Sequence, residues 1–224
     1  MTDISPIWIS VQVACCATIC SVTSGTLLAY VVMKLRRLRP LVDTLLTLPL
    51  VLPPTVVGFF LLLLLGKNSP IGQFFHNIGL PFIFSIRGAI AAAFVVSFPL
   101  MYRAALGAMK QMDCQLLYAA RTLGASERRI FLQVILPNCK SGILAGTILA
   151  FARAMGEFGA TIMIAGNIPG KTQTMALAVY TAVQSGNRTE AFLWSVIILV
   201  LSAIAIVGIH YFEKNRNGGE VDGF

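Results

Sequence analysis

The sequence predicts an all-α fold, a polytopic bundle of about five transmembrane helices with a pair of short helices on its cytoplasmic side. Of the 224 residues, 57% are hydrophobic and only 12% are charged. Soluble domains, by contrast, are about half apolar and about a quarter charged. The apolar residues also gather in runs of about 20 or more, the length that crosses the hydrocarbon core of a bilayer. A chain with so little polar surface belongs in a membrane.

Each of the predicted spans is an apolar run bounded by charge, glycine or proline. The runs cover residues 7–33, 41–65, 88–109, 142–166 and 191–212. Pro49, Pro53 and Pro54 interrupt the second run, and because proline removes a backbone donor, we expect a break or kink there. Both a packing kink and a moving gate element fit such a break. Residues 172–183 form a shorter apolar segment, interpreted as an outer or re-entrant helix.

Basic residues set the expected orientation. Lysine and arginine are enriched in cytoplasmic loops, and a basic cluster directly follows the first span. This cluster consists of Lys34, Arg36, Arg37 and Arg39. It places the N-terminus outside, and five crossings then leave the C-terminus in the cytoplasm, together with Lys214 and Arg216. The outer loops carry only Lys67, Arg87, Lys171 and Arg188. The net charge of +8 therefore indicates the orientation of the chain in the membrane, and no nucleic-acid partner is expected.

The sequence offers no catalytic or metal constellation. The five cysteines show no CxxC spacing and are expected to be free thiols, while His76 and His210 stand alone. Residues 165–172 fit a relaxed P-loop pattern, but they leave an apolar span on the predicted outer side, where ATP is scarce. We therefore expect residues 1–224 to form a single domain that is not an enzyme, has no catalytic or metal-binding residues and binds no cofactor.

The loop after the third span, residues 110–137, is long and unusually patterned. Ala119, Ala120 and Leu123 recur at helical spacing before Gly124, a residue typical of helix ends. Ile130, Phe131 and Val134 form a second apolar stripe. The pattern predicts two short amphipathic helices around a glycine. Such helices either lie on lipid headgroups or dock on a partner protein.

The segment from Tyr118 to Pro137 resembles the EAA loop of ABC importer permeases. That pattern reads Glu-Ala-Ala, three residues, Gly, nine residues, Ile, any residue, Leu-Pro. Here Tyr118 stands in place of the glutamate and Val134 in place of the isoleucine, while the other pattern residues match. The resemblance implies that the loop couples the chain to an ATPase. The residues implied in this coupling are Ala119, Ala120, Arg121, Leu123, Gly124, Ala125, Leu136 and Pro137.

A second resemblance concerns the substrate. Residues 156–161, Gly-Glu-Phe-Gly-Ala-Thr, and residues 166–170, Gly-Asn-Ile-Pro-Gly, are most similar to molybdate and tungstate permeases. Sulfate permeases carry a related version ending in Gly-Ser. Residues 48–54 and 97–101 extend the likeness over nearly the whole chain. The resemblance implies a molybdate or tungstate importer working by alternating access; a sulfate or thiosulfate permease and a non-transport membrane scaffold are the alternatives.

Two ionisable residues lie within the predicted fourth span. Arg153 and Glu157 are four apart, so on a helix they share a face and can pair. A charge at membrane depth costs about 2.5–3.5 kcal/mol on insertion scales and usually faces a bundle interior or a water-filled cavity. The two residues are thus a structural pair or, together with Thr161, candidates for the translocation pathway.

The resemblance to importer permeases also implies the partners. These are a second copy of the chain, two ATP-binding-cassette ATPase subunits that carry the ATP and magnesium, and an external oxyanion-binding protein. The implied location is the bacterial cytoplasmic (inner) membrane, with the lipid bilayer as surroundings.

Overall fold

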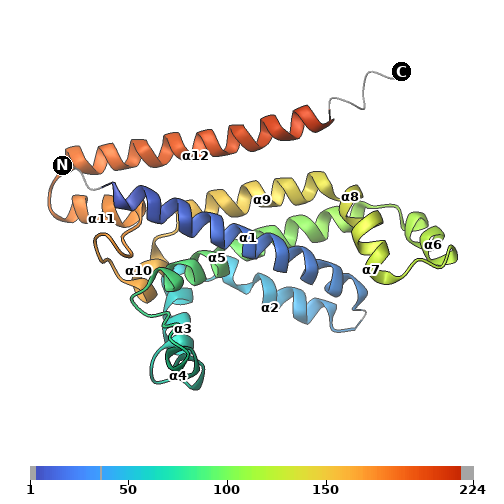
Figure 1. The fold of residues 1–224 in the computed structure, drawn as a ribbon, viewed down its shortest axis with the longest axis horizontal. Helices are drawn as coiled ribbons and strands as arrows, with labels where there is room; N and C mark the ends of the chain where they lie inside the picture. Colours follow the sequence, from blue (N-terminus) through green and yellow to red (C-terminus); the bar gives the residue numbers. More distant parts are fainter. Residues whose placement is uncertain (1–3, 36, 218–224) are drawn as a thin grey trace.

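The computed structural model describes residues 4–35 and 37–217, with side chains described as far as residue 208. It consists of helices and the turns between them (Figure 1). The elements are α1 (Ser5–Lys34), α2 (Arg39–Val51), α3 (Pro54–Leu65), α4 (Pro70–Asn77), α5 (Ile86–Gln111), α6 (Cys114–Thr122), α7 (Glu127–Ile130), a π-helical turn (Phe131–Ile135), α8 (Leu136–Asn138), α9 (Lys140–Met155), α10 (Gly159–Ala165), α11 (Met175–Gln184) and α12 (Arg188–Asn217).

The structure has three to five candidate membrane crossings, and the upper number equals the five that the sequence predicts. Within the described residues, α1, α5 and α12 are each long and apolar enough to cross a bilayer alone. Two further pairs of helices qualify together but are bent, α2 with α3 by 112° and the segment 127–138 with α9 by 75°. By length and composition, counting each bent pair as one span gives up to five crossings; in the second pair α9 is the crossing helix, and residues 127–138 belong to the loop that precedes it. α11 has 10 residues, too few to cross, and confirms the short helix predicted near 172–183.

The α2–α3 break lies at the expected prolines. Leu52 and Pro53 both take extended backbone conformations, with ψ of 141° and 135°, because each precedes a proline. Pro49, in contrast, lies inside α2 without ending it. α3 then turns away from the direction of α2 and carries α4 at its far end (Figure 1).

The fourth predicted span, residues 142–166, is not one helix. α9 ends at Met155 and α10 begins only at Gly159, so Glu157 lies in the break between them. The prediction that Arg153 and Glu157 share a helix is therefore wrong. Gly156 and Gly159 flank the break, and glycine disfavours a helix interior by roughly 0.5–1 kcal/mol relative to alanine.

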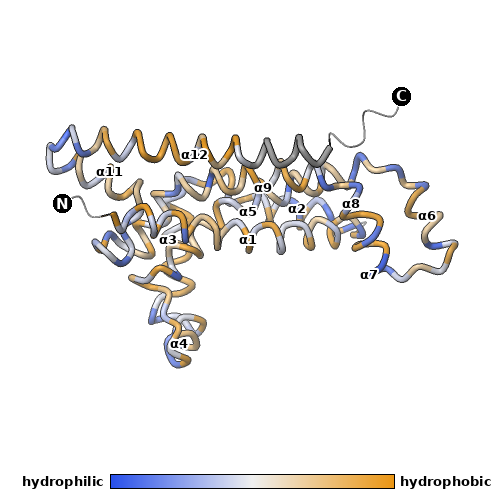
Figure 2. Tube along the Cα trace, turned by 45° about the horizontal axis from the view of Figure 1, so that its top comes forward, coloured by the Kyte–Doolittle hydropathy of each residue, from blue (hydrophilic) through white to orange (hydrophobic). Residues whose placement is uncertain are grey.

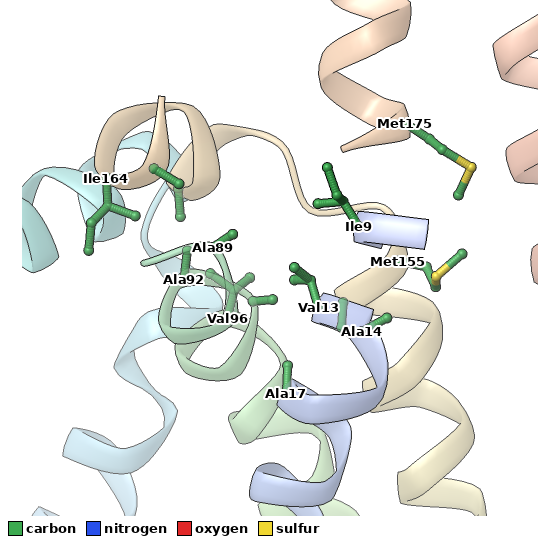
Figure 3. Packing of buried hydrophobic residues seen from close by; sticks show 14 of the residues in the cluster. Ile9, Val13, Ala14, Ala17, Ala89, Ala92, Val96, Met155, Ile164 and Met175 are labelled. Carbon is green, nitrogen blue, oxygen red and sulfur yellow. The ribbon is translucent and has the colours of Figure 1, made fainter. Parts of the chain in front are cut away.

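The core runs along the interface of α1, α5 and α9. Small and branched side chains from these and adjoining elements meet there (Figure 3), because small residues let transmembrane helices approach closely. The residues include Ile9, Val13, Ala14 and Ala17 of α1 and Ala89, Ala92 and Val96 of α5. Two hydroxyls, Ser21 and Ser97, hydrogen-bond across the α1–α5 interface at 3.1 Å.

α12 is the least covered span. Only 11% of its most apolar stretch within residues 188–208 is buried, and it carries exposed apolar side chains such as Leu199. In Figure 2 this helix is hydrophobic along much of its length, while hydrophilic residues gather at its start and around α7 and α8. Such an exposed apolar helix suits contact with hydrocarbon. Lys214 and Arg216 lie in α12 beyond the described side chains, and Arg36 lies outside the described residues.

Candidate functional site: the coupling loop and an intramembrane ion pair

The predicted loop, residues 110–137, lies at one end of the molecule and carries α6 and α7 (Figure 1). The two helices are joined by a turn at Gly124, whose φ is 75°. This left-handed conformation favours glycine, and no heavy atom lies within 4 Å of the position where a Cβ would be. Side chains also start both helices: Asp113 accepts from the Gln115 N–H, and Ser126 accepts from the Arg129 N–H. The sequence thus correctly predicts two short helices around Gly124.

The two halves of the loop differ in burial. After Gly124, Ile130 and Ile135 are each only 1% exposed and anchor the chain in the core. α6, in contrast, has no buried residue. Leu116 is 45% exposed, and Leu123, seven residues later and so on the same side, is 87% exposed. Leu117 and Ala120 of α6 pack against the core, whereas this side of the helix stays exposed and apolar, a feature that marks protein or membrane contact sites.

Glu127 ties this loop to the bundle. Its Oε1 accepts a hydrogen bond from Arg121 Nε at 2.9 Å, and its Oε2 accepts from Lys34 Nζ at 2.6 Å and from the Tyr30 hydroxyl at 2.7 Å. These hydrogen bonds, led by that from Arg121, lower the pKa of the Glu127 carboxyl from 4.5 to about 2. The last turn of α1, α6 and α7 thus meet at one carboxylate.

The structure separates the predicted coupling residues into two groups. Those from 119 to 125 lie in α6 or the turn that follows it, where Ala119, Leu123 and Gly124 are exposed. Leu136 and Pro137 lie in α8, at the base of α9, and do not join the α6 face. Sequence reasoning assigned no role to Glu127. An acid directly after a potential cap, in a loop rich in arginine, was the available signal.

The intramembrane pair is present, although its backbone setting differs from the prediction. Arg153 Nη1 lies 2.8 Å from Glu157 Oε2, and the two side chains are 29% and 1% exposed. The N–H is poorly aligned with this oxygen, so the contact is an ion pair and not a directed hydrogen bond. The other carboxylate oxygen accepts a hydrogen bond from the Ala160 N–H at 2.7 Å. Glu157 therefore both neutralises Arg153 and caps the first turn of α10.

Three buried threonine hydroxyls, in α10 and α1, lack a hydrogen-bond partner among the described residues. Thr161 follows in α10 with no exposed surface, and its Oγ1 has no hydrogen-bond partner among the described residues. The hydroxyls of Thr18 and Thr26 on α1 likewise have no hydrogen-bond partner among the described residues. A buried polar atom left unpaired costs about 1–3 kcal/mol.

The two broken spans pack against each other close to their breaks. A Cβ on Gly58 of α3 would lie 2.7 Å from the Ala160 Cα, so only glycine permits this approach. On the other side, a Cβ on Gly159 would lie 3.1 Å from the Pro54 side chain. The contact brings α3 and α10 together beside the ion pair.

Comparison with known proteins identifies the family. The model of the family "binding-protein-dependent transport system inner membrane component" matches residues 21–215. The chain is 43% identical to the molybdenum transport system permease protein ModB of Escherichia coli K12 over 202 residues, 89% of this chain and 88% of the relative. It is 38% identical to ModB of Haemophilus influenzae over 215 residues, 95% and 94% of the two chains.

A solved structure shares the fold. An inward-facing crystal structure of the MetNI methionine ABC transporter superposes with a TM-score of 0.73 over 94% of each chain, at 16% sequence identity. The chain therefore belongs to the family of binding-protein-dependent transport system inner membrane components, the multi-pass permease subunits that work with a separate ATPase and a binding protein.

Proposed function

We propose that this chain is the permease subunit of an ABC importer that moves molybdate or tungstate into the cytoplasm by alternating access. The substrate follows from the relatives, which are permeases of molybdenum transport systems and match nearly the whole chain. The uncovered apolar face of α6 carries the coupling part of the proposal. α6 lies beyond the long helices, at the end of the molecule, where a partner protein has access to it (Figure 1).

The proposed assembly contains two copies of this chain around one pathway, two ATPase subunits and an external binding protein. The ATPases bind ATP and magnesium and dock on residues 110–137, chiefly on α6. The N-terminus lies outside and the C-terminus lies in the cytoplasm of a bacterial cell. This orientation places Glu127 and its partners on the cytoplasmic side.

Within this assembly, Glu127 links the docking helix to α1. A displacement of α6 by the ATPase would pull on Arg121, and through Glu127 on Lys34 and Tyr30 at the end of α1. α1 packs along α5, so the motion reaches the core of the bundle. The paired breaks at residues 52–53 and 156–158 are the positions where the spans can bend.

Arg153 is the proposed contact for the dianion in the pathway. It is the partner of Glu157 that retains solvent exposure, 29% against 1%. A partly exposed guanidinium offers N–H donors suited to an oxyanion. Thr161 adds an unpaired hydroxyl on the following helix.

Reconstitution tests the function. The permease is assembled with its ATPase in proteoliposomes, and loaded binding protein is supplied outside. We expect ATP-dependent uptake of radioactive molybdate that unlabelled tungstate inhibits and sulfate does not. Inhibition by sulfate and thiosulfate would instead indicate a sulfate permease. An assembled complex without ATP-dependent uptake of any of these anions would favour the scaffold alternative.

Reporter fusions test the orientation. A reporter active only in the cytoplasm, fused to the C-terminus, should be active, and a matched fusion at the N-terminus should be inactive. The opposite pattern would contradict the proposed orientation and would place Glu127 outside the cell.

A further inference from the structure

A cavity of about 670 Å³ lies where the turn after α3 meets the segment after α10. This part of the molecule lies away from α6 and α7 (Figure 1). The volume falls within the usual range of ligand pockets, about 300–1,000 Å³. The polar groups in its wall are Lys67, Asn68, His76 and Lys171. No aspartate or glutamate of the described chain lines it, so its charge is positive.

The cavity is lined by segments that lie far apart in the sequence. Lys67 follows the end of α3, whereas Lys171 lies between α10 and α11, far away in the sequence. The wall between them includes Phe84, whose backbone N–H donates to the Ile164 carbonyl at 3.1 Å. This bond fastens the segment before α5 to the last turn of α10.

Phe84 also holds an unusual backbone conformation. Its φ is 51°, the only positive value at a non-glycine residue in the described chain. For a bulky side chain this left-handed geometry costs roughly 1–2 kcal/mol. Residues held in such conformations cluster at ligand sites and switch regions. The wall of the cavity therefore holds a strained backbone at Phe84 in addition to the positive charges of Lys67 and Lys171.

Neither lysine is neutralised by the protein. Both are exposed, and no carboxylate of the described residues pairs with either of them. Charges of one sign in a cleft with low-dielectric walls raise the local concentration of counter-ions and their association rates by about 10–10³-fold. The apolar wall, which includes Leu62, Leu63 and Ile83, supplies the low-dielectric boundary.

The helix α10 links the wall of the cavity to the intramembrane ion pair. In the first turn of α10 the Ala160 N–H donates to Glu157, and in its last turn the Ile164 carbonyl accepts from the Phe84 N–H. One short helix thus has the ion pair at its start and the wall of the cavity at its end.

We infer that this cavity is an electropositive vestibule, in which Lys67 and Lys171 receive a hydrated tetrahedral dianion before it reaches Arg153. Asn68 and His76 supply additional hydrogen-bonding groups at the same wall. The inference rests on the proposed function, because it takes the transported solute to be an oxyanion. The competing occupant of a basic outer surface is an acidic lobe of the binding protein, and the experiment separates the two.

The test uses the complete transporter in proteoliposomes with saturating loaded binding protein. The double variant Lys67→Gln/Lys171→Gln removes the charge, Lys67→Arg/Lys171→Arg keeps it, and Arg188→Gln removes one outer charge away from the cavity. At low ionic strength we expect the glutamine double variant to take up molybdate about tenfold more slowly than the wild type. The arginine variant and Arg188→Gln should stay within about twofold of wild type. The defect should shrink as salt is added.

Docking of the binding protein is measured on the same samples. The vestibule predicts an unchanged Kd between the binding protein and the glutamine variant. A loss of uptake that follows a loss of docking overturns the inference in favour of the acidic lobe, and unchanged uptake overturns it outright. If the wild-type complex transports no oxyanion at all, the proposed function fails instead, whatever the variants do.

Discussion

Removing Arg153 should destabilise the protein more than removing any surface charge. Arg153→Leu leaves Glu157, whose side chain is 1% exposed, without its counter-charge. Breaking a buried pair in this way costs about 3–5 kcal/mol of unfolding free energy. Glu157→Gln should cost less, about 1–3 kcal/mol, for two reasons. The glutamine carbonyl can still accept from the Ala160 N–H, and Arg153, at 29% exposure, still reaches water.

The double variant Arg153→Leu/Glu157→Gln should recover most of this loss. Neither charge is then left unpaired, and replacing a buried ion pair as a whole is often close to neutral. The interaction energy in the double-mutant cycle should therefore be about 3 kcal/mol or more. Arg103→Leu is the matched control, because its contact with Asp43 is 3.9 Å long and its side chain is 56% exposed. Its cost should be about 0–1 kcal/mol.

The measurement is the free energy of unfolding in mixed micelles, titrated with a denaturing detergent. Trp194, only 4% exposed, reports loss of the core through its fluorescence. If Arg153→Leu were no more destabilising than Arg103→Leu, the ion pair would have no structural value. A double variant as unstable as Arg153→Leu alone would refute the pairing argument itself.

Transport by the same double variant separates the two roles of the pair. Normal molybdate uptake would show that the pair is only structural. A folded, assembled protein with poor uptake but ATP hydrolysis still stimulated by the binding protein would assign Arg153 to the anion route. An Arg153→Ala protein with unchanged abundance, assembly and uptake would contradict both roles.

Three further perturbations test the loop and the packed breaks. Gly124→Asp should insert normally, since a side chain there meets open space, but should weaken ATPase binding and uncouple transport; normal transport would count against the docking role. Glu127→Gln should lower ATP-dependent uptake with little change in stability, because the ion pairs that it breaks with Lys34 and Arg121 are exposed to solvent, where such pairs are weak. Since the pKa of Glu127 lies near 2, below its ordinary 4.5, its contribution is complete above pH 4.5 and is lost only as the pH falls towards 2; a change in loop protection from hydrogen exchange between pH 5 and 8 would contradict this. Gly58→Ala should destabilise by about 1–3 kcal/mol through collision with the Ala160 backbone, whereas Gly107→Ala, with open space around it, should not; equal unfolding free energies would refute the close approach of α3 and α10.

The class of fold could be predicted from composition and run length. An apolar stretch of about 20 residues in a bilayer has to satisfy its backbone internally, so it becomes helix whatever its neighbours are. α1, α5 and α12 accordingly agree with the predicted runs. The double proline at residues 53–54 and the glycine at 124 act on the backbone locally, and both appear where the sequence places them.

The break at residues 156–158 could not be predicted in the same way. An unbroken apolar run is compatible with a straight helix and with a broken one, because inside a protein the freed backbone groups can find other partners. Here Glu157 supplies that partner, and the contact of α10 with α3 fixes the direction of the second half. Spacing alone correctly predicts that Arg153 and Glu157 pair, but not that the carboxylate also caps a new helix.

The sequence by itself determined the membrane class, the number of apolar runs, the turn at Gly124 and the candidate residues of the coupling loop, because each depends on local composition or on a short motif. The tertiary structure alone decided which distant residues meet. It joined Glu127 to Lys34, and it brought Lys67 and Lys171 to one cavity. The physical reason is that these contacts depend on how the helices pack and bend, and packing is set by the fit of whole surfaces, which no local pattern specifies.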